Sequence, residues 1–299
     1  MTGVITTGNH PKALWPGMHA FFGAQYKEHP EEYREIFSMQ KSGKNYEEDT
    51  LVTGFGLAPE KTQGGGISYD SETQGFTKRY THTVFGTGYI VTEEELEDNL
   101  YETVSRKRIK RLAFSMRQTR EIIGANILNR GFNSSYTGGD SKELLATDHP
   151  SVAGNWSNEL ATAADFSEAA LEDIVIQIGQ AKNDRGLNIA LRGMKLIVPV
   201  NLQFDAKRVL KSGLQSGTAN NDINAVRGMF DFSINHYLTD TDAWFVKTDC
   251  PDGLTWFDRR ALAFTQDNDF DTGNAKAKAT MRFSCGWTDP RTCYGSPGA

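Results

Sequence analysis

Histidine and cysteine are the side chains best suited to metal binding and nucleophilic chemistry, and their spacing in this sequence supports neither. The six histidines include no pair at the i, i+4 spacing that two helical metal ligands need. His149 precedes a proline and is interpreted as a turn residue. The three cysteines have no metal-ligand or disulfide spacing, so we expect reduced thiols in an intracellular protein. They are Cys250, Cys285 and Cys293.

Carboxylate and glycine patterns give no stronger indication of catalysis. Asp267, Asp269 and Asp271 alternate like the start of a calcium loop. The bidentate glutamate that completes such a loop is missing, because Glu172 is the last glutamate of the chain. No phosphate-binding loop, nucleophile elbow or zinc-protease motif occurs. We therefore expect no catalytic residue, no cofactor and no metal site, and a protein that is not an enzyme.

Length and composition indicate a protein with substantial cores and an acidic balance. The chain has 299 residues, 38% of them hydrophobic, which allows one large domain or two modest ones. Its formal charge is −6, whereas proteins whose main task is to grip nucleic acid are usually basic. Residues 1–18 contain no apolar run typical of a signal peptide, and no window approaches a membrane span. We expect no membrane partner.

One long helix, over residues 92–132, is the element on which the other segments must be arranged. Thr92 and Glu95 form a capping box, and apolar residues then recur at steps of three and four without a proline. At ~1.5 Å per residue the helix would be about 55–60 Å long, too long to be buried in one compact domain. Two helices that break near Gly124 are the alternative.

The middle of this long helix is basic, and its start is acidic. The acidic start suits the helix dipole and needs no functional explanation. The basic run includes Arg108 and Arg111. It is either a solvated face or a docking strip for an acidic protein segment or a nucleic-acid backbone.

Residues 1–49 are predicted to form an arm. Prolines interrupt this segment too often for a core of its own, and a short helix is expected to begin at Pro30. The arm is nevertheless rich in aromatic side chains, which implies burial against something other than itself. The expected contact residues are Trp15, Phe21, Phe22, Tyr33 and Phe37.

Residues 50–91 are predicted to form a long hairpin. Its second strand, over residues 76–91, is dense in β-branched and aromatic residues, and a glycine run marks the tip. A two-stranded hairpin is marginal alone, so we expect this one to lie on a neighbouring copy of the protein. Two edge strands of an intramolecular sheet are the alternative. The contact candidates are Gly64, Gly65, Gly66, Tyr69, Phe76 and Tyr80.

The remaining segments alternate between helices and strands. The segments that follow the long helix indicate a compact α/β layer. It contains a helix capped by Ser167 or Asp165, an apolar strand at 196–198 and a helix capped by Asn201. Residues 255–299 return to β-structure, with strands expected to end near Phe257, near Phe264 and at Trp287.

Five short segments, in this order, resemble the major capsid protein of tailed bacteriophages, which has the Hong Kong 97-type fold. They are Gly88–Leu100, Leu145–Pro150, Leu196–Pro199, Asp242–Phe245 and Arg282–Arg291. The resemblance implies an α+β fold with a long spine helix, an extended β-hairpin loop, and peripheral and axial domains. It assigns 1–53 to the N-terminal arm, 54–91 to the extended loop, 92–160 with 255–299 to the peripheral domain, and 161–254 to the axial domain.

The same resemblance implies a structural protein that self-assembles as hexamers and pentamers. The closed product would be an icosahedral shell around phage double-stranded DNA, assembled in the host cytoplasm. The implied partners are further copies of the chain, a scaffolding protein, a portal protein, optionally a cement or decoration protein, and DNA through weak non-specific contacts. A nanocompartment shell of the same fold, enclosing a cargo enzyme, is the alternative.

Some members of the family cross-link a hairpin lysine to an asparagine of the next subunit, with a glutamate as proton acceptor. Lys61 and Lys78 lie in the hairpin here, and Asn268 and Asn274 lie in the C-terminal segment. That segment has no glutamate, so the required base is missing and we expect no self-cross-linking. A capsid subunit with autocatalytic ligase activity is therefore the less favoured alternative. Because only a short arm precedes the hairpin, we expect a separate scaffolding protein or a processed precursor.

Overall fold

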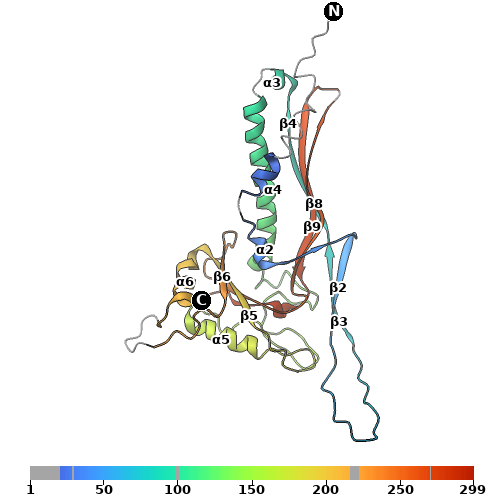
Figure 1. Ribbon diagram of the computed structural model, residues 1–299, viewed down its shortest axis with the longest axis vertical. Helices are drawn as coiled ribbons and strands as arrows, with labels where there is room; N and C mark the ends of the chain where they lie inside the picture. The colour runs from blue at the N-terminus through green and yellow to red at the C-terminus, as the bar shows by residue number, and fades with distance from the viewer. Residues whose placement is uncertain (1–20, 29, 98–100, 216–221, 270) are drawn as a thin grey trace, which may run out of the picture.

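The computed structural model describes residues 21–28, 30–97, 101–215, 222–269 and 271–299. Two four-stranded sheets and one two-stranded ribbon organise these residues. Figure 1 shows an elongated molecule, in which the long helix α4 runs beside the first sheet. The second sheet lies near the C-terminal end of α4. A hairpin projects past the body beside the second sheet. The predicted α+β class is confirmed.

The first sheet joins the C-terminal strands to the arm. Its order is β1-β8-β9-β4, and only the β1–β8 pair is parallel. Alternate side chains of β9 are buried from Ala277 to Phe283, so one face of the sheet packs against α4. The strands expected near Phe257 and Phe264 are a single strand. The bounds are β1 Ser38–Lys41, β4 Thr83–Val91, β8 Leu254–Asn268 and β9 Ala275–Trp287.

The long helix is shorter than predicted, and its glycine does not kink it. Thr92 Oγ1 accepts the Glu95 N–H at 3.4 Å, which confirms the threonine half of the predicted capping box. The Glu95 carboxylate pairs with Arg108. The described helical segments are α3, Glu93–Glu97, and α4, Tyr101–Asn129; residues 98–100 lie outside the described part. α4 continues through Gly124, where a β-carbon would meet Tyr33 Cβ at 3.0 Å. Glycine is therefore present because the arm approaches the helix closely.

The second sheet has the order β10-β7-β5-β6, and α5 and α6 contribute to its core. Ser167 caps α5 by accepting the Ala170 N–H, as predicted. A 3-10 turn, η2, precedes α6, so this helix begins later than a cap at Asn201 would allow. The bounds are α5 Glu168–Gly179, β5 Gly193–Pro199, η2 Val200–Leu202, α6 Gln203–Lys211, β6 Asp231–Asn235, β7 Trp244–Thr248, η3 Pro290–Thr292 and β10 Cys293–Ser296.

Three strands cross the domain boundaries that the resemblance implies. β10 lies within 255–299, which the resemblance assigns to the peripheral domain, yet it pairs with β7 in the second sheet. Cys293 and Tyr294 are fully buried there. Similarly, β1 from the predicted arm and β4 from the predicted hairpin loop are both strands of the first sheet. A short strand has too few alternating apolar and polar residues to indicate which sheet it joins.

The predicted second strand of the hairpin is two strands in two different sheets. β3, Gln74–Thr81, pairs with β2, Tyr46–Val52, in the two-stranded ribbon. After His82 the chain continues as β4, which pairs with β9 along its whole length. This half of the hairpin therefore finds its partner within the chain, and the expectation of a neighbouring copy is wrong for β4. Alternation predicts a strand but does not identify its partner.

Candidate assembly surfaces

The described residues offer little for catalysis. They contain no group of three or more His, Cys, Asp or Glu side chains that could hold a metal ion, and no helix apolar and long enough to cross a membrane. Burial raises the pKa of the Cys285 and Cys293 thiols to about 12, which disfavours the reactive thiolate. Burial also raises the pKa of Cys250.

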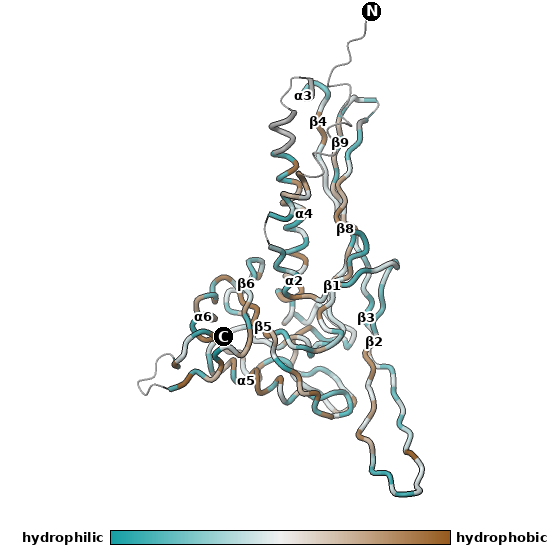
Figure 2. The backbone as a smooth tube through the Cα atoms, viewed as in Figure 1, coloured by the Kyte–Doolittle hydropathy of each residue, from teal (hydrophilic) through white to brown (hydrophobic). Residues whose placement is uncertain are grey.

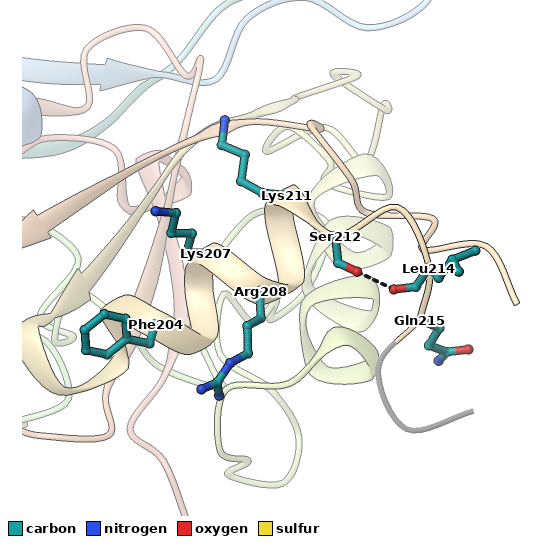
Figure 3. A pocket seen from close by; sticks show the side chains of 7 residues that line it. All are labelled: Phe204, Lys207, Arg208, Lys211, Ser212, Leu214 and Gln215. Carbon is teal, nitrogen blue, oxygen red and sulfur yellow. Dashed lines mark hydrogen bonds between the residues drawn. The ribbon is translucent and has the colours of Figure 1, made fainter. Parts of the chain in front are cut away.

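A pocket of about 580 Å³ lies beside α6 on the second sheet's helical layer (Figure 3). Three basic side chains and two apolar ones line it together with Ser212 and Gln215. None of these side chains is a carboxylate, thiol or imidazole, so the lining contains no acid–base pair. The other lining residues are Phe204, Lys207, Arg208, Lys211 and Leu214.

Lys78, one of the lysines considered for cross-linking, is already engaged within its own chain. Its Nζ donates to the Thr137 carbonyl at 2.9 Å and lies 5.2 Å from the Trp287 ring centroid. Burial lowers its pKa, and the nearby Asp140 carboxylate acts in the opposite direction. Lys61 is exposed on the hairpin. The side chain of Asn268 lies outside the described part.

The arm anchors are buried inside the chain. Trp15 lies outside the described residues, and Phe21 is partly buried against the core. Phe22 stacks on Phe264 of β8, with ring centroids 4.8 Å apart. Tyr33 is fully buried and Phe37 nearly so, and both contact Trp256. In this arrangement Phe22, Tyr33 and Phe37 have no side-chain surface left for a neighbouring subunit.

A buried glutamate that the sequence analysis missed fastens this arm to the long helix. Glu121 of α4 accepts the N–H groups of Glu32 and Tyr33, at 3.0 and 2.9 Å. These amides start α2, Tyr33–Ile36, so the carboxylate satisfies donors that a helix N-terminus leaves free. Burial raises the pKa of Glu121 to about 7. Its position in a basic helix could have suggested a paired carboxylate, but nothing local indicates a partner 88 residues away.

The same arm segment also binds the second sheet. Glu32 accepts the His236 backbone N–H at 2.9 Å and lies 2.6 Å from its Nδ1. Glu35 pairs with Lys195 of β5, and its carbonyl accepts a hydrogen bond from Lys247 of β7. Residues 31–37 therefore bridge α4 and the second sheet.

Two basic side chains of α4 form ion pairs with acidic side chains of the same chain. Arg108 forms a bidentate pair with Glu95, at 2.7 and 3.0 Å. Lys110 lies 3.4 Å from Glu28 of the arm. Arg111 is exposed on the same helix. Of these two ion pairs, only that of Lys110 with Glu28 joins the basic run to another acidic segment, and that segment belongs to the same subunit.

The hairpin arm, which we define as residues 54–72, differs from the N-terminal arm in its exposure. Leu57 is 81% exposed and Tyr69 93% exposed, and the glycine tip, Gly64 to Gly66, lies between them. Figure 2 shows hydrophobic positions along this projecting loop. Its described contact with the body is Arg185, which donates to the Ser71 carbonyl at 2.5 Å and lies 3.5 Å from Asp70.

The two other hairpin candidates lie in β3 and face different surroundings. Phe76 is partly exposed on the ribbon. Tyr80 is buried, its ring is 5.0 Å from Phe257, and its hydroxyl is 2.7 Å from Thr288 Oγ1. The base of the hairpin is therefore anchored on the first sheet, while the arm beyond it is not.

A model of the phage capsid protein family matches residues 75–296, about three quarters of the chain. This chain belongs to the phage capsid protein family. No curated protein matches it in sequence. The family match covers α4, the second sheet and every strand of the first sheet except β1. The Hong Kong 97-type prediction made from five short segments is therefore confirmed, as a major capsid protein and a component of the virion capsid.

Solved structures show that the capsid fold extends over nearly the whole chain. The capsid of Cyanophage P-SCSP1u is similar with a TM-score of 0.59 and 9% identity, covering 88% of this chain and 86% of that one. The capsid of a native GTA particle has a TM-score of 0.56 and 12% identity, covering 100% and 93%. The virus-like particle from Pyrococcus furiosus has a TM-score of 0.53 and 10% identity, covering 94% and 98%. At such low identity the likeness shows the fold alone.

Proposed function

We propose that this capsid protein assembles as hexamers and pentamers into a closed icosahedral shell around phage double-stranded DNA. The observation that carries the proposal is the hairpin arm, which extends strongly exposed apolar side chains beyond the body of a capsid-family subunit. A neighbouring copy that received this arm would bury them. Because the arm and its receiving surface are different patches, such a contact is heterologous, and a heterologous contact whose rotation closes generates a ring such as a hexamer or pentamer.

The proposed assembly includes further partners. A scaffolding protein would guide the shell in the host cytoplasm, a portal protein would occupy the DNA entrance, and a cement or decoration protein is an optional reinforcement. Contacts with the packaged DNA would be weak and non-specific, because the chain carries a net charge of −6. The proposed role is structural and non-enzymatic.

Electron microscopy of the chain expressed with its scaffolding protein tests the proposal. We expect closed particles in which hexamers and pentamers are resolved, and DNA-filled particles when the packaging proteins are supplied. A chain that stays monomeric at high concentration with its scaffold present contradicts the proposal.

A nanocompartment shell that encloses a cargo enzyme is the second candidate, and the similarity to a virus-like particle favours it. Assembly from this chain alone, with a co-purifying protein and no DNA, would support it. The less favoured autocatalytic ligase requires a ladder of covalent oligomers on denaturing gels. We expect none, because Lys78 is held by Thr137 and Trp287 of its own chain.

A further inference from the structure

A buried polar cluster lies where the link between α4 and the second sheet reaches β10. His149 is fully buried, and its ring stacks on Trp156 with 4.8 Å between the ring centroids. Its Nδ1 lies 2.7 Å from Asp140 Oδ2, and its Nε2 lies 3.1 Å from Asn158 Oδ1. The residue that the sequence analysis interpreted as a turn residue therefore has a polar partner at each ring nitrogen.

The orientation of the Asn158 amide is fixed by its other partners. Its Nδ2 lies 2.7, 3.0 and 3.0 Å from three backbone carbonyl oxygens, those of Leu144, Pro290 and Cys293. Its Oδ1 accepts the Ala146 N–H at 2.9 Å. A flipped amide would set its oxygen against the three carbonyl oxygens, so the atom that faces His149 is an acceptor.

Both ring nitrogens of His149 thus face acceptors. A neutral imidazole has one N–H and an ionised carboxylate has none, so the two hydrogen bonds need one additional proton. We propose that His149 carries this proton as a buried imidazolium, and that the cation fastens the link, residues 133–158, to the second sheet so that loss of the proton loosens the joint between the two sheets.

The charges around the ring favour a cation. The nearest is the Asp140 carboxylate. The guanidinium of Arg291 lies over the Trp156 ring, 4.6 Å from the centroid of that ring. The same ring stacks with His149. Arg291 is itself balanced by Asp184 and Asp289, at 2.7 and 3.2 Å. The cluster therefore holds three largely buried carboxylates for one buried guanidinium, and an imidazolium lowers the uncompensated negative charge.

The more distant charges are arranged around the edge of the cluster. From β3, the Lys78 ammonium acts electrostatically on the Asp140 side. On the link itself, Lys142 and Asp148 pair with each other at 2.5 Å. Glu143 and Glu159 add further negative charge nearby, and burial raises the pKa of Glu159. The Lys142 backbone N–H donates to Asp140 Oδ1 at 3.2 Å, whereas Oδ2 is the oxygen that faces the His149 ring.

The hydrogen bonds from Asn158 explain why this proton acts on the joint. The Asn158 carbonyl accepts the Gly295 N–H of β10 at 3.2 Å. The Asn158 side-chain amide donates to the carbonyls of the first residue of η3 and of the residue that follows η3. On the other side, the Leu145 N–H donates to the Gly131 carbonyl at the end of the long helix, at 2.9 Å. His149 thereby positions Asn158, which connects the link that follows α4 to β10 of the second sheet.

Solid-state NMR of assembled particles labelled with ¹⁵N-histidine tests the protonation state directly. We expect the His149 resonances, assigned by their loss in His149→Gln, to show both ring nitrogens protonated at neutral pH. Asp140→Asn supplies an amide donor to Nδ1, so a neutral ring then satisfies both hydrogen bonds, and Nδ1 should become unprotonated. Asp148→Asn is the matched control and should leave both nitrogens protonated. A single protonated nitrogen in the unsubstituted protein overturns the proposal.

Amide hydrogen exchange at Gly295 tests the effect on the joint. After correction for base catalysis, we expect exchange to be at least about tenfold faster under conditions where the NMR spectrum shows a neutral His149 ring than where it shows both nitrogens protonated, as one charge-assisted hydrogen bond is lost. Asp140→Asn should remove this acceleration, because its hydrogen bonds do not depend on the additional proton. Equal acceleration in both proteins, or none in the unsubstituted one, contradicts the proposed fastening.

Discussion

The N-terminal arm and the hairpin arm share one sequence feature: each carries aromatic residues but has too little regular structure to form a core of its own. The structure treats them differently. Residues 31–41 are built into the body through Tyr33, Phe37 and the parallel pair of β1 with β8. Residues 54–72 project with Leu57 and Tyr69 uncovered. A segment without a core therefore needs a partner, and only the three-dimensional structure reveals whether that partner is the same chain.

The largest expected effect on the unassembled subunit is that of Phe37→Ala. Phe37 is nearly fully buried against Trp256, so its truncation leaves a cavity and should lower the free energy of unfolding by about 3–5 kcal/mol. Denaturant unfolding of the subunit measures this. Tyr69→Ala in the hairpin arm is the matched control and should stay within about 0.5 kcal/mol. Similar losses from both substitutions would erase the difference between the two arms.

The second effect concerns pH and the attachment of the N-terminal arm by Glu121. Because burial raises its pKa to about 7, the folded protein keeps this proton at a pH where the unfolded chain has lost it. The stabilisation is complete below about pH 4.5 and is lost as the pH rises through about 7. Relative to Glu121→Gln, the native protein should lose up to about 3 kcal/mol across that range. Parallel stability–pH curves for the two proteins would disprove this account.

A smaller effect is expected where the hairpin arm contacts its own body. Arg185→Ala removes the bond to Ser71 and the ion pair with Asp70, which are partly exposed, so the subunit should lose less than about 1 kcal/mol. Tryptic cleavage after Lys61 should nevertheless become faster, because the arm is released. If the cleavage rate does not change, the arm is held by contacts other than Arg185.

The smallest effect on subunit stability should come from deletion of residues 62–69. This tip includes the glycine run and Tyr69, and it contributes to neither hydrophobic core, so the free energy of unfolding should change by less than about 0.5 kcal/mol. Particle yield, measured by electron microscopy, should fall sharply because the proposed contact with a neighbouring copy is lost. Normal particles from the deleted chain would remove the hairpin arm from the assembly mechanism.

The long helix shows how far local patterns reach. Its cap at Thr92 and its apolar stripe were predicted because they depend on residues three and four positions apart. The role of Gly124 was not predictable, because it depends on Tyr33, a residue far away in sequence that packs onto the helix. Likewise Arg108 was recognised as charged and exposed, but its bidentate partner Glu95 belongs to the preceding helix α3.

The candidate contact residues divide in the same way. The sequence identified Phe22, Tyr33 and Phe37 as anchors, and they are anchors, but within their own subunit. Gly64 to Gly66 and Tyr69 were expected at an exposed tip and lie there. Exposure in a glycine-rich loop follows from local composition, whereas burial of an aromatic ring requires a second surface that local composition does not specify.

By itself, the sequence determined the α+β class, most of the helices and strands, and the capsid family, because capping, periodicity and short family motifs are local properties. The tertiary structure alone decided which sheet received β1, β4 and β10, and which carboxylates hold the arm. It also placed His149 between Asp140 and Asn158. Strand pairing and buried hydrogen bonds join residues far apart in the chain, and no local pattern encodes a partner at that distance.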